Sequence, residues 1–296
     1  METSAFLNAM NNRMSKQKYI YRFIPAILTL MLCAPLLHSQ SPDRIRVPLT
    51  DPTRPVQLRA HLLNGSITVT AADVKEVTVE ARLREGGRND SRAESGMRRI
   101  PIASTGLSVD ADNNQVRVST DQISRAVDLN ITVPVHTSLS LKSVNDGSIT
   151  VTGVDGELDV DNVNGPVTLK NISGSAVAHA LNSRVLVTFV RINPQKPMAF
   201  SSLNGDIDVT FPPDLKANVS MRTDNGEVFS DFDVQLQATA PKETVEDNRA
   251  QGGKYRVRVD KTVRGTINGG GQDIQFKDFN GNIYIRKAGI KAGAKE

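Results

Sequence analysis

Apolar and polar residues alternate along most of this chain, and the alternation restarts after each Asn-Gly or Asp-Gly dipeptide. The phrase at 63–70 (LNGSITVT) returns at 145–152 (NDGSITVT) and again at 203–210 (LNGDIDVT). Successive side chains of a strand point to opposite faces, so this period of two predicts strands with one buried face. Asn and Gly tolerate the backbone angles of tight turns, so each dipeptide predicts a turn between strands.

The spacing of these phrases predicts how the strands are organised. From Thr137 onward a strand and a turn recur roughly every nine or ten residues, so two strands and two turns span about 20 residues, one rung of a β-solenoid. A single rung cannot bury its apolar side chains, whereas stacked rungs bury them in one column. We therefore expect an all-β, repetitive β-solenoid over residues 136–287, with this inward-facing set: Ile149, Val151, Leu158, Val160, Val167, Leu169, Val185, Val187, Ile207 and Val209.

Residues 40–135 are expected to form an N-terminal β region that includes a cap for the stack, because an open terminal rung would pair with other chains. A polar run at 85–99, with charges of both signs, predicts a solvated loop. The sequence leaves open whether residues 40–135 are a separate domain or the first rungs. The expected strands are Val56–Leu63, Ile67–Thr70, Val77–Ala81, Leu107–Val109, Gln115–Ser119 and Val127–Val133.

The rest of the chain continues the rhythm with one polar interruption. Residues 235–253 predict an insertion loop, and residues 288–296, rich in Gly, Ala and Lys, predict a mobile tail. No long window apart from the N-terminal segment has the apolar spacing of a helix. The expected strands are Ser148–Thr152, Glu157–Val160, Pro166–Lys170, Ser175–Ala180, Arg184–Phe189, Tyr255–Val259, Gly265–Asn268, Asp273–Phe276 and Asn282–Arg286.

The N-terminus predicts export. A positive stretch from Arg13 to Arg22 precedes the apolar run Phe23–Leu37, which has the length of a signal-peptide core and is short for a membrane-spanning helix. Residues 1–39 are thus interpreted as a signal peptide, or alternatively as an uncleaved anchor. The single cysteine, Cys33, lies inside this run, so the mature chain would have no disulfide. Leu32 before it is too large for a lipidation site.

The amino-acid composition disfavours two classes of function. Most of the net charge of +4 comes from the N-terminal segment, so the remainder is close to neutral and lacks the basic surface of a nucleic-acid-binding protein. Aromatic residues make up 4% and Trp is absent, which disfavours the aromatic platforms that stack on sugars or bases.

The repeated Asn/Asp-Gly-x-Ile/Val-x-Val phrase resembles a bacterial family labelled putative adhesin, a domain of unknown function. The phrases at 153–158 (GVDGEL), 164–169 (NGPVTL) and 278–284 (DFNGNIY) carry the same resemblance, which spans roughly residues 60–287. The resemblance implies a β-solenoid and an exported, surface or periplasmic protein. Its motifs are structural, so it implies no catalytic residues.

Paired aspartates are the only candidates for catalysis. At positions i and i+2 of a strand both carboxylates face one side, where they could act as acid and base in a carbohydrate-cleaving β-helix. The simpler interpretation is a solubilising outer face, and clustering with Arg or Lys in one groove would favour the enzyme. The pairs are Asp159 and Asp161, Asp206 and Asp208, and Asp231 and Asp233.

No metal or cofactor is expected. The histidines His38, His61, His136 and His179 lack the spacing of metal ligands. The stretch 268–274 (NGGGQDI) faintly resembles a calcium-binding repeat, but it occurs once, whereas such sites need successive repeats, so it predicts a glycine-rich turn.

Taken together, the sequence predicts an exported, non-enzymatic, adhesin-like scaffold of the periplasm or cell surface. Its partner would be an unknown envelope or surface component and not nucleic acid, with membrane contact only through an uncleaved N-terminal segment. Two alternatives stay open: a carbohydrate-active β-helix enzyme using the paired carboxylates, and a membrane-tethered signalling or envelope-stress module.

Overall fold

The computed structural model describes residues 42–84, 104–123, 125–237, 243–247, 255–259 and 261–289. The predicted signal peptide at 1–39 and the predicted loop at 85–99 lie outside these residues, as does most of the predicted tail. Within the described residues every regular element is a strand, so the all-β prediction is confirmed. No helix in this part of the chain is long and apolar enough to cross a membrane.

The strands form two faces, here called face A and face B, joined into one 20-stranded sheet. Face A contains, in spatial order, β5 (Leu107–Asp112), β6 (Gln115–Thr120), β2 (Val56–Asn64), β8 (Thr137–Asn145), β10 (Asp155–Asn162), the second half of β11 (Val167–Ala180), β13 (Met198–Ser202), β21 (Gln272–Lys277), β15 (Ala217–Arg222), β20 (Val263–Ile267) and β17 (Val234–Leu236).

Face B contains, in the same direction, β1 (Asp43–Pro48), β4 (Glu76–Leu83), β7 (Val127–Pro134), β3 (Ile67–Ala72), β9 (Ile149–Thr152), the first half of β11, β12 (Val185–Ile192), β14 (Ile207–Phe211), β22 (Ile283–Lys287) and β16 (Val228–Ser230). The strands β18 (Glu243–Asp247) and β19 (Tyr255–Val259) pair with each other. A strand of face A and the strand of face B that follows it form one rung.

Parallel registers align the repeated phrases from rung to rung. Ile149 lies between Ile67 and Val167, and the same line continues through Val185 to Ile207. Side chains from both faces meet in a single hydrophobic core. The predicted inward set is confirmed, because all of its members are at most 3% exposed.

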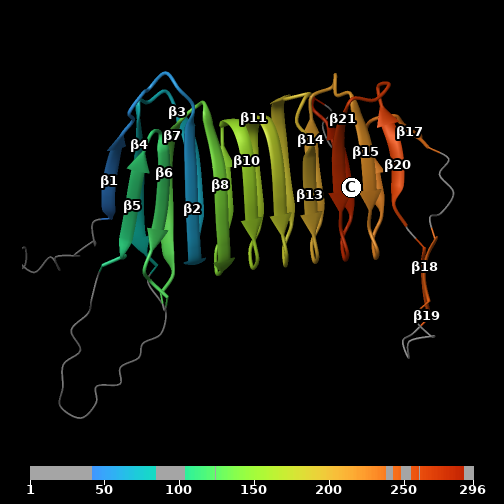
Figure 1. Ribbon diagram of the computed structural model, residues 1–296, viewed down its shortest axis with the longest axis horizontal. Helices are drawn as coiled ribbons and strands as arrows, with labels where there is room; N and C mark the ends of the chain where they lie inside the picture. The colour runs from blue at the N-terminus through green and yellow to red at the C-terminus, as the bar shows by residue number, and fades with distance from the viewer. Residues whose placement is uncertain are drawn as a thin grey trace, which may run out of the picture. The chain divides into compact units, whose positions relative to one another are not determined.

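The rungs do not stack in chain order. Rung β2–β3 lies between β6–β7 and β8–β9, and rung β21–β22 lies between β13–β14 and β15–β16 (Figure 1). Residues far apart in sequence are therefore hydrogen-bonded at both ends of the stack. The parallel ladder runs without a break from β2 into β8, so residues on either side of position 135 belong to the same stack.

One expected turn is absent. The sequence predicts two strands separated by a turn at 171–174, but β11 is a single strand of 14 residues. Asn171 and Gly174 have positive φ angles of 51° and 105°, and the register shifts around Ile172. This irregularity bends the strand so that its first half joins face B and its second half joins face A, replacing a turn with a bulge.

The structure also contains strands that the pattern did not predict: β1, β8, β13, β15, β16, β17 and β18. Of these, β18 lies within the expected insertion at 235–253. Both ends of the stack switch to antiparallel pairing, through β1, β4 and β5 at one end and through β20 and β17 at the other. The outermost strand of face B, β1, carries Arg44 and ends at Pro48, which discourages pairing with a further strand.

Glycine is required where the turns of neighbouring rungs touch. A Cβ on Gly147 would lie 1.9 Å from the carbonyl oxygen of Gly65, and one on Gly165 would lie 1.8 Å from that of Gly147. A side chain at either position would push the rungs apart.

We expect Gly147→Ala to lower the free energy of unfolding by about 3 kcal/mol or more, because the added methyl group would overlap backbone of the adjacent rung. Gly153→Ala is the matched control, since its Cβ would have 3.7 Å of clearance and only its φ of 74° would cause strain. That strain should lower the free energy of unfolding by about 1 kcal/mol. Denaturant unfolding measures both, and equal losses would contradict the close-contact argument.

Candidate functional site

The structure brings some, but not all, of the candidate carboxylates together. Asp159 and Asp161 lie on β10 in face A, whereas Asp208 lies on β14 in face B with Asp206 just before it. Asp208 accepts hydrogen bonds from Arg286 Nε at 2.8 and 2.9 Å, an interaction that raises the pKa of the guanidinium. Asp231 also raises the pKa of Arg286, so Asp208 and Asp231 both lie near this guanidinium on either side of β22, whereas Asp159 and Asp161 lie on the other face.

The remaining candidates have structural roles. Asp231, of the third aspartate pair, accepts a backbone N–H from Lys287 at 3.2 Å. His179 lies within hydrogen-bonding distance of Ser201, with Nδ1 and Oγ 2.8 Å apart. Asn268, Gly269 and Gly270 all have positive φ angles, as expected for a glycine-rich turn. Across the described residues, no three His, Cys, Asp or Glu side chains are grouped closely enough to hold a metal ion.

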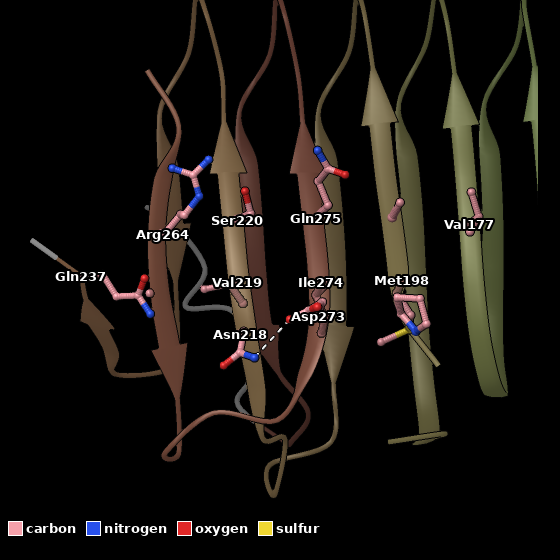
Figure 2. Close-up of a pocket in the computed structure, with 13 residues that line it drawn as sticks. Val177, Met198, Asn218, Val219, Ser220, Gln237, Arg264, Asp273, Ile274 and Gln275 are labelled. Atoms are coloured by element: carbon pink, nitrogen blue, oxygen red, sulfur yellow. Dashed lines mark hydrogen bonds between the residues drawn. The ribbon is translucent and has the colours of Figure 1, made fainter. Parts of the chain in front are cut away.

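A shallow groove of about 500 Å³ crosses the outer side of face A. Figure 2 shows Val177 at one end and Arg264 with Gln237 at the other. Between them Ala199, Gln275 and Ser220 follow one another in register across β13, β21 and β15. Val177 is 46% exposed and supplies an apolar contact surface.

The polar groups of the groove are suited to binding. Asn218 Nδ2 donates to Asp273 Oδ1 at 3.1 Å and to the carbonyl oxygen of Gly271 at 2.8 Å, which holds this amide in place. The lining also includes the hydroxyl of Ser220 and the amide of Gln275. Amide, hydroxyl and apolar groups arranged in a line fit an elongated ligand.

A second hollow of about 460 Å³ contains a charged cluster. The Oδ2 atom of Asp155 lies 2.8 Å from Arg191 and 3.4 Å from Nδ1 of His136, and Lys196 pairs with Glu157 at 2.9 Å. Because Arg191 and His136 are largely exposed, these pairs contribute little to stability. The charges pair within the cluster.

The most regular polar feature is a row of hydrogen-bonded amides at the corner between the faces, here called the asparagine ladder. Each side chain after the first donates its Nδ2 to the Oδ1 of the Asn on the preceding rung of the stack, at 2.8 to 3.0 Å. Its members, in spatial order, are Asn145, Asn164, Asn182, Asn204, Asn280 and Asn225.

The backbone repeats in step with the ladder. The N–H of each later member donates to the carbonyl oxygen of the residue preceding the neighbouring Asn, as from Asn164 to Val144 and from Asn280 to Leu203. The recurring Asn in the sequence was the available signal, but it predicted a turn and not a continuous ladder. Asn64 sits in register with Asn145, yet its side chain donates to the carbonyl oxygen of Ile123.

Short parallel strands on two faces, tied along a corner by amides, define an all-β stacked-rung protein. The model of the Toastrack DUF4097 family matches residues 40–268, and the chain belongs to this family. The predicted resemblance to an adhesin-like domain of unknown function is thereby confirmed.

Two solved structures are similar to this chain. One is a putative cell adhesion protein from Clostridium sporogenes, with a TM-score of 0.45, 9% identity, and coverage of 83% of this chain and 99% of that one. The other is a putative adhesin from Bacteroides fragilis, with a TM-score of 0.31, 13% identity, and coverage of 84% and 98%. No curated protein sequence matches the chain.

We expect Asn182→Ala to lower the free energy of unfolding by about 1–2 kcal/mol, because Asn182 makes ladder hydrogen bonds on both sides. Asn225→Ala is the matched control and should lower the free energy of unfolding by about half as much, since Asn225 ends the ladder with one such bond. Thermal or denaturant unfolding of the two variants compares them. A larger loss of unfolding free energy for Asn225→Ala than for Asn182→Ala would show that stability does not follow the number of ladder hydrogen bonds.

Proposed function

We propose that this protein is an exported, non-enzymatic, adhesin-like β-solenoid scaffold that presents its strand faces to a component of the cell envelope or surface. The observation that carries the proposal is the regular outer surface of the stack, on which side chains of neighbouring rungs line up in register, as Ala199, Gln275 and Ser220 do. The groove over β13, β21 and β15 is one such binding surface.

The hydrogen-bonded stack supports a role in presenting a rigid binding surface. Every rung of the parallel stack shares backbone hydrogen bonds with its neighbours, and the asparagine ladder adds side-chain bonds from Asn145 to Asn225. A surface held in this way loses little conformational freedom when a partner binds, so less of the binding free energy is lost to ordering.

Export is the part of the proposal that can be tested first. The full chain, recovered from fractionated bacterial cells, should have a mature N-terminus near Gln40 and appear outside the cytoplasm, because Phe23–Leu37 has the length of a signal-peptide core. Intact mass and N-terminal peptide mapping provide the measurement.

Leu30→Arg is the control, since a charge inside the apolar run should block export and leave the intact chain in the cytoplasm. An intact N-terminus in the membrane fraction would favour the tethered module instead. An intact wild-type chain in the cytoplasm would refute export.

A further inference from the structure

One position at the corner holds a hydrogen-bond donor in four rungs, whereas the equivalent residue of β11 is Ala180. This position lies two residues before the ladder position, and in those four rungs its side chain donates to a turn carbonyl oxygen of the neighbouring rung. The pairs, each at 3.0 Å, are Ser143 to Gly65, Asn162 to Gly147, Ser202 to Ser183, and Thr223 to Gly281. The donor satisfies a carbonyl group that the strand ladders leave unpaired.

In rung β21–β22 the same position is occupied by Asp278. Lys277 is in register with Ser201, which places Asp278 beside Ser202. Asp278 is 2% exposed, and its Oδ1 accepts the N–H of Phe279 at 2.7 Å. Its Oδ2 is buried and has no hydrogen-bond partner among the described residues.

The carbonyl group that Asp278 faces belongs to Gly205. A Cβ placed on Gly281 would lie 2.6 Å from Asp278 Oδ2 and 2.8 Å from the Gly205 oxygen, so both oxygens border the same small space. An ionised carboxylate only accepts hydrogen bonds, and two acceptors that face each other repel. A protonated carboxyl group has an O–H that can donate, as the hydroxyl or amide side chains do at the equivalent position of four other rungs.

We propose that in mildly acidic solution Asp278 is a neutral carboxylic acid in the folded protein and donates its O–H to the carbonyl oxygen of Gly205. The corner of rung β21–β22 is thus a proton-binding site. The carboxyl group takes the place of the hydroxyl or amide found at the equivalent positions.

The surroundings of Asp278 favour the neutral form. Burial, together with the nearby carboxylate of Asp206, raises the pKa of Asp278 to about 6 against the opposing effect of the backbone N–H groups of Phe279 and Asn280. The other charged groups around this corner are Lys277, Arg222 and Asp224. Arg222 pairs with Asp224 at 3.2 Å, and no cation forms an ion pair with Asp278 in the described part of the chain.

The proton stabilises the fold in a defined pH window. An unfolded aspartate titrates near pH 4, so the folded state binds more protons than the unfolded state between about pH 4 and 6. The stabilisation is complete below pH 4 and is lost as the pH rises through about 6. Since β21–β22 separates β13–β14 from β15–β16, ionisation would loosen the rungs at this end.

The protonation state can be measured directly in the full chain. Carbon-13 NMR of the Asp278 carboxyl group should show a titration midpoint near pH 6, and Asp206→Asn should lower that midpoint because it removes a negative neighbour. A midpoint at or below pH 4 would overturn the proposal.

Unfolding experiments at pH 5 and pH 8 give a second test. Asp278→Asn supplies an N–H donor, as Asn162 does. Its folding equilibrium constant should match that of the wild type at pH 5 and be roughly ten- to a hundredfold larger at pH 8. Asp278→Ala, which has no donor, should be less stable to unfolding than the wild type at pH 5. Asp214→Asn, at an exposed aspartate, is the matched control and should follow the wild type.

Two results would overturn the proposal. One is Asp278→Asn being less stable than the wild type at pH 8. The other is calcium stabilising the wild type but not Asp278→Asn at pH 8, which would show that the carboxylate is ionised and binds a cation.

Discussion

The parallel register between neighbouring rungs is the constraint on which this structure depends. It places Ile67 beside Ile149 and Ile149 beside Val167, so that inward side chains stack in columns. A slip of one residue would turn every inward side chain of a rung toward solvent. The same register brings the corner amides within hydrogen-bonding distance, so the core and the asparagine ladder depend on one alignment.

The corners are more restricted than the faces. Backbone of adjacent rungs touches at Gly147 and Gly165, and several turn carbonyl groups accept a side-chain hydrogen bond from inside the corner, as that of Gly147 does from Asn162. Outward positions on the strands have no such requirement and carry charges, hydroxyl groups and apolar residues. A buried acid at the corner therefore has a structural explanation, whereas Asp159 and Asp208, on different faces, lie apart on the outer surface.

This division between corners and faces agrees with a scaffold whose shape is set internally and whose outer surface can vary. The groove near Gln275 and Ser220 is formed largely by outward side chains. Each of these side chains lies within one or two residues of a buried one along its strand. Substitutions in the groove would leave the stack undisturbed, because the strands are held by backbone hydrogen bonds and by the core. Under the proposed function, binding specificity and stability would thus be carried by different residues.

The sequence by itself determined which side chains face inward, as at Ile149 and Val209, because alternation is a local property of a strand. It also predicted turns at the Asn-Gly dipeptides and the membership in the family. Only the tertiary structure decided that β2–β3 and β21–β22 lie between rungs distant in the chain, that β11 bends without a turn, and that Asp278 faces Gly205. Near-identical phrases can pair with any similar neighbour, so the order of the rungs is set by the ends of the stack and by packing across it, which a short repeat does not encode.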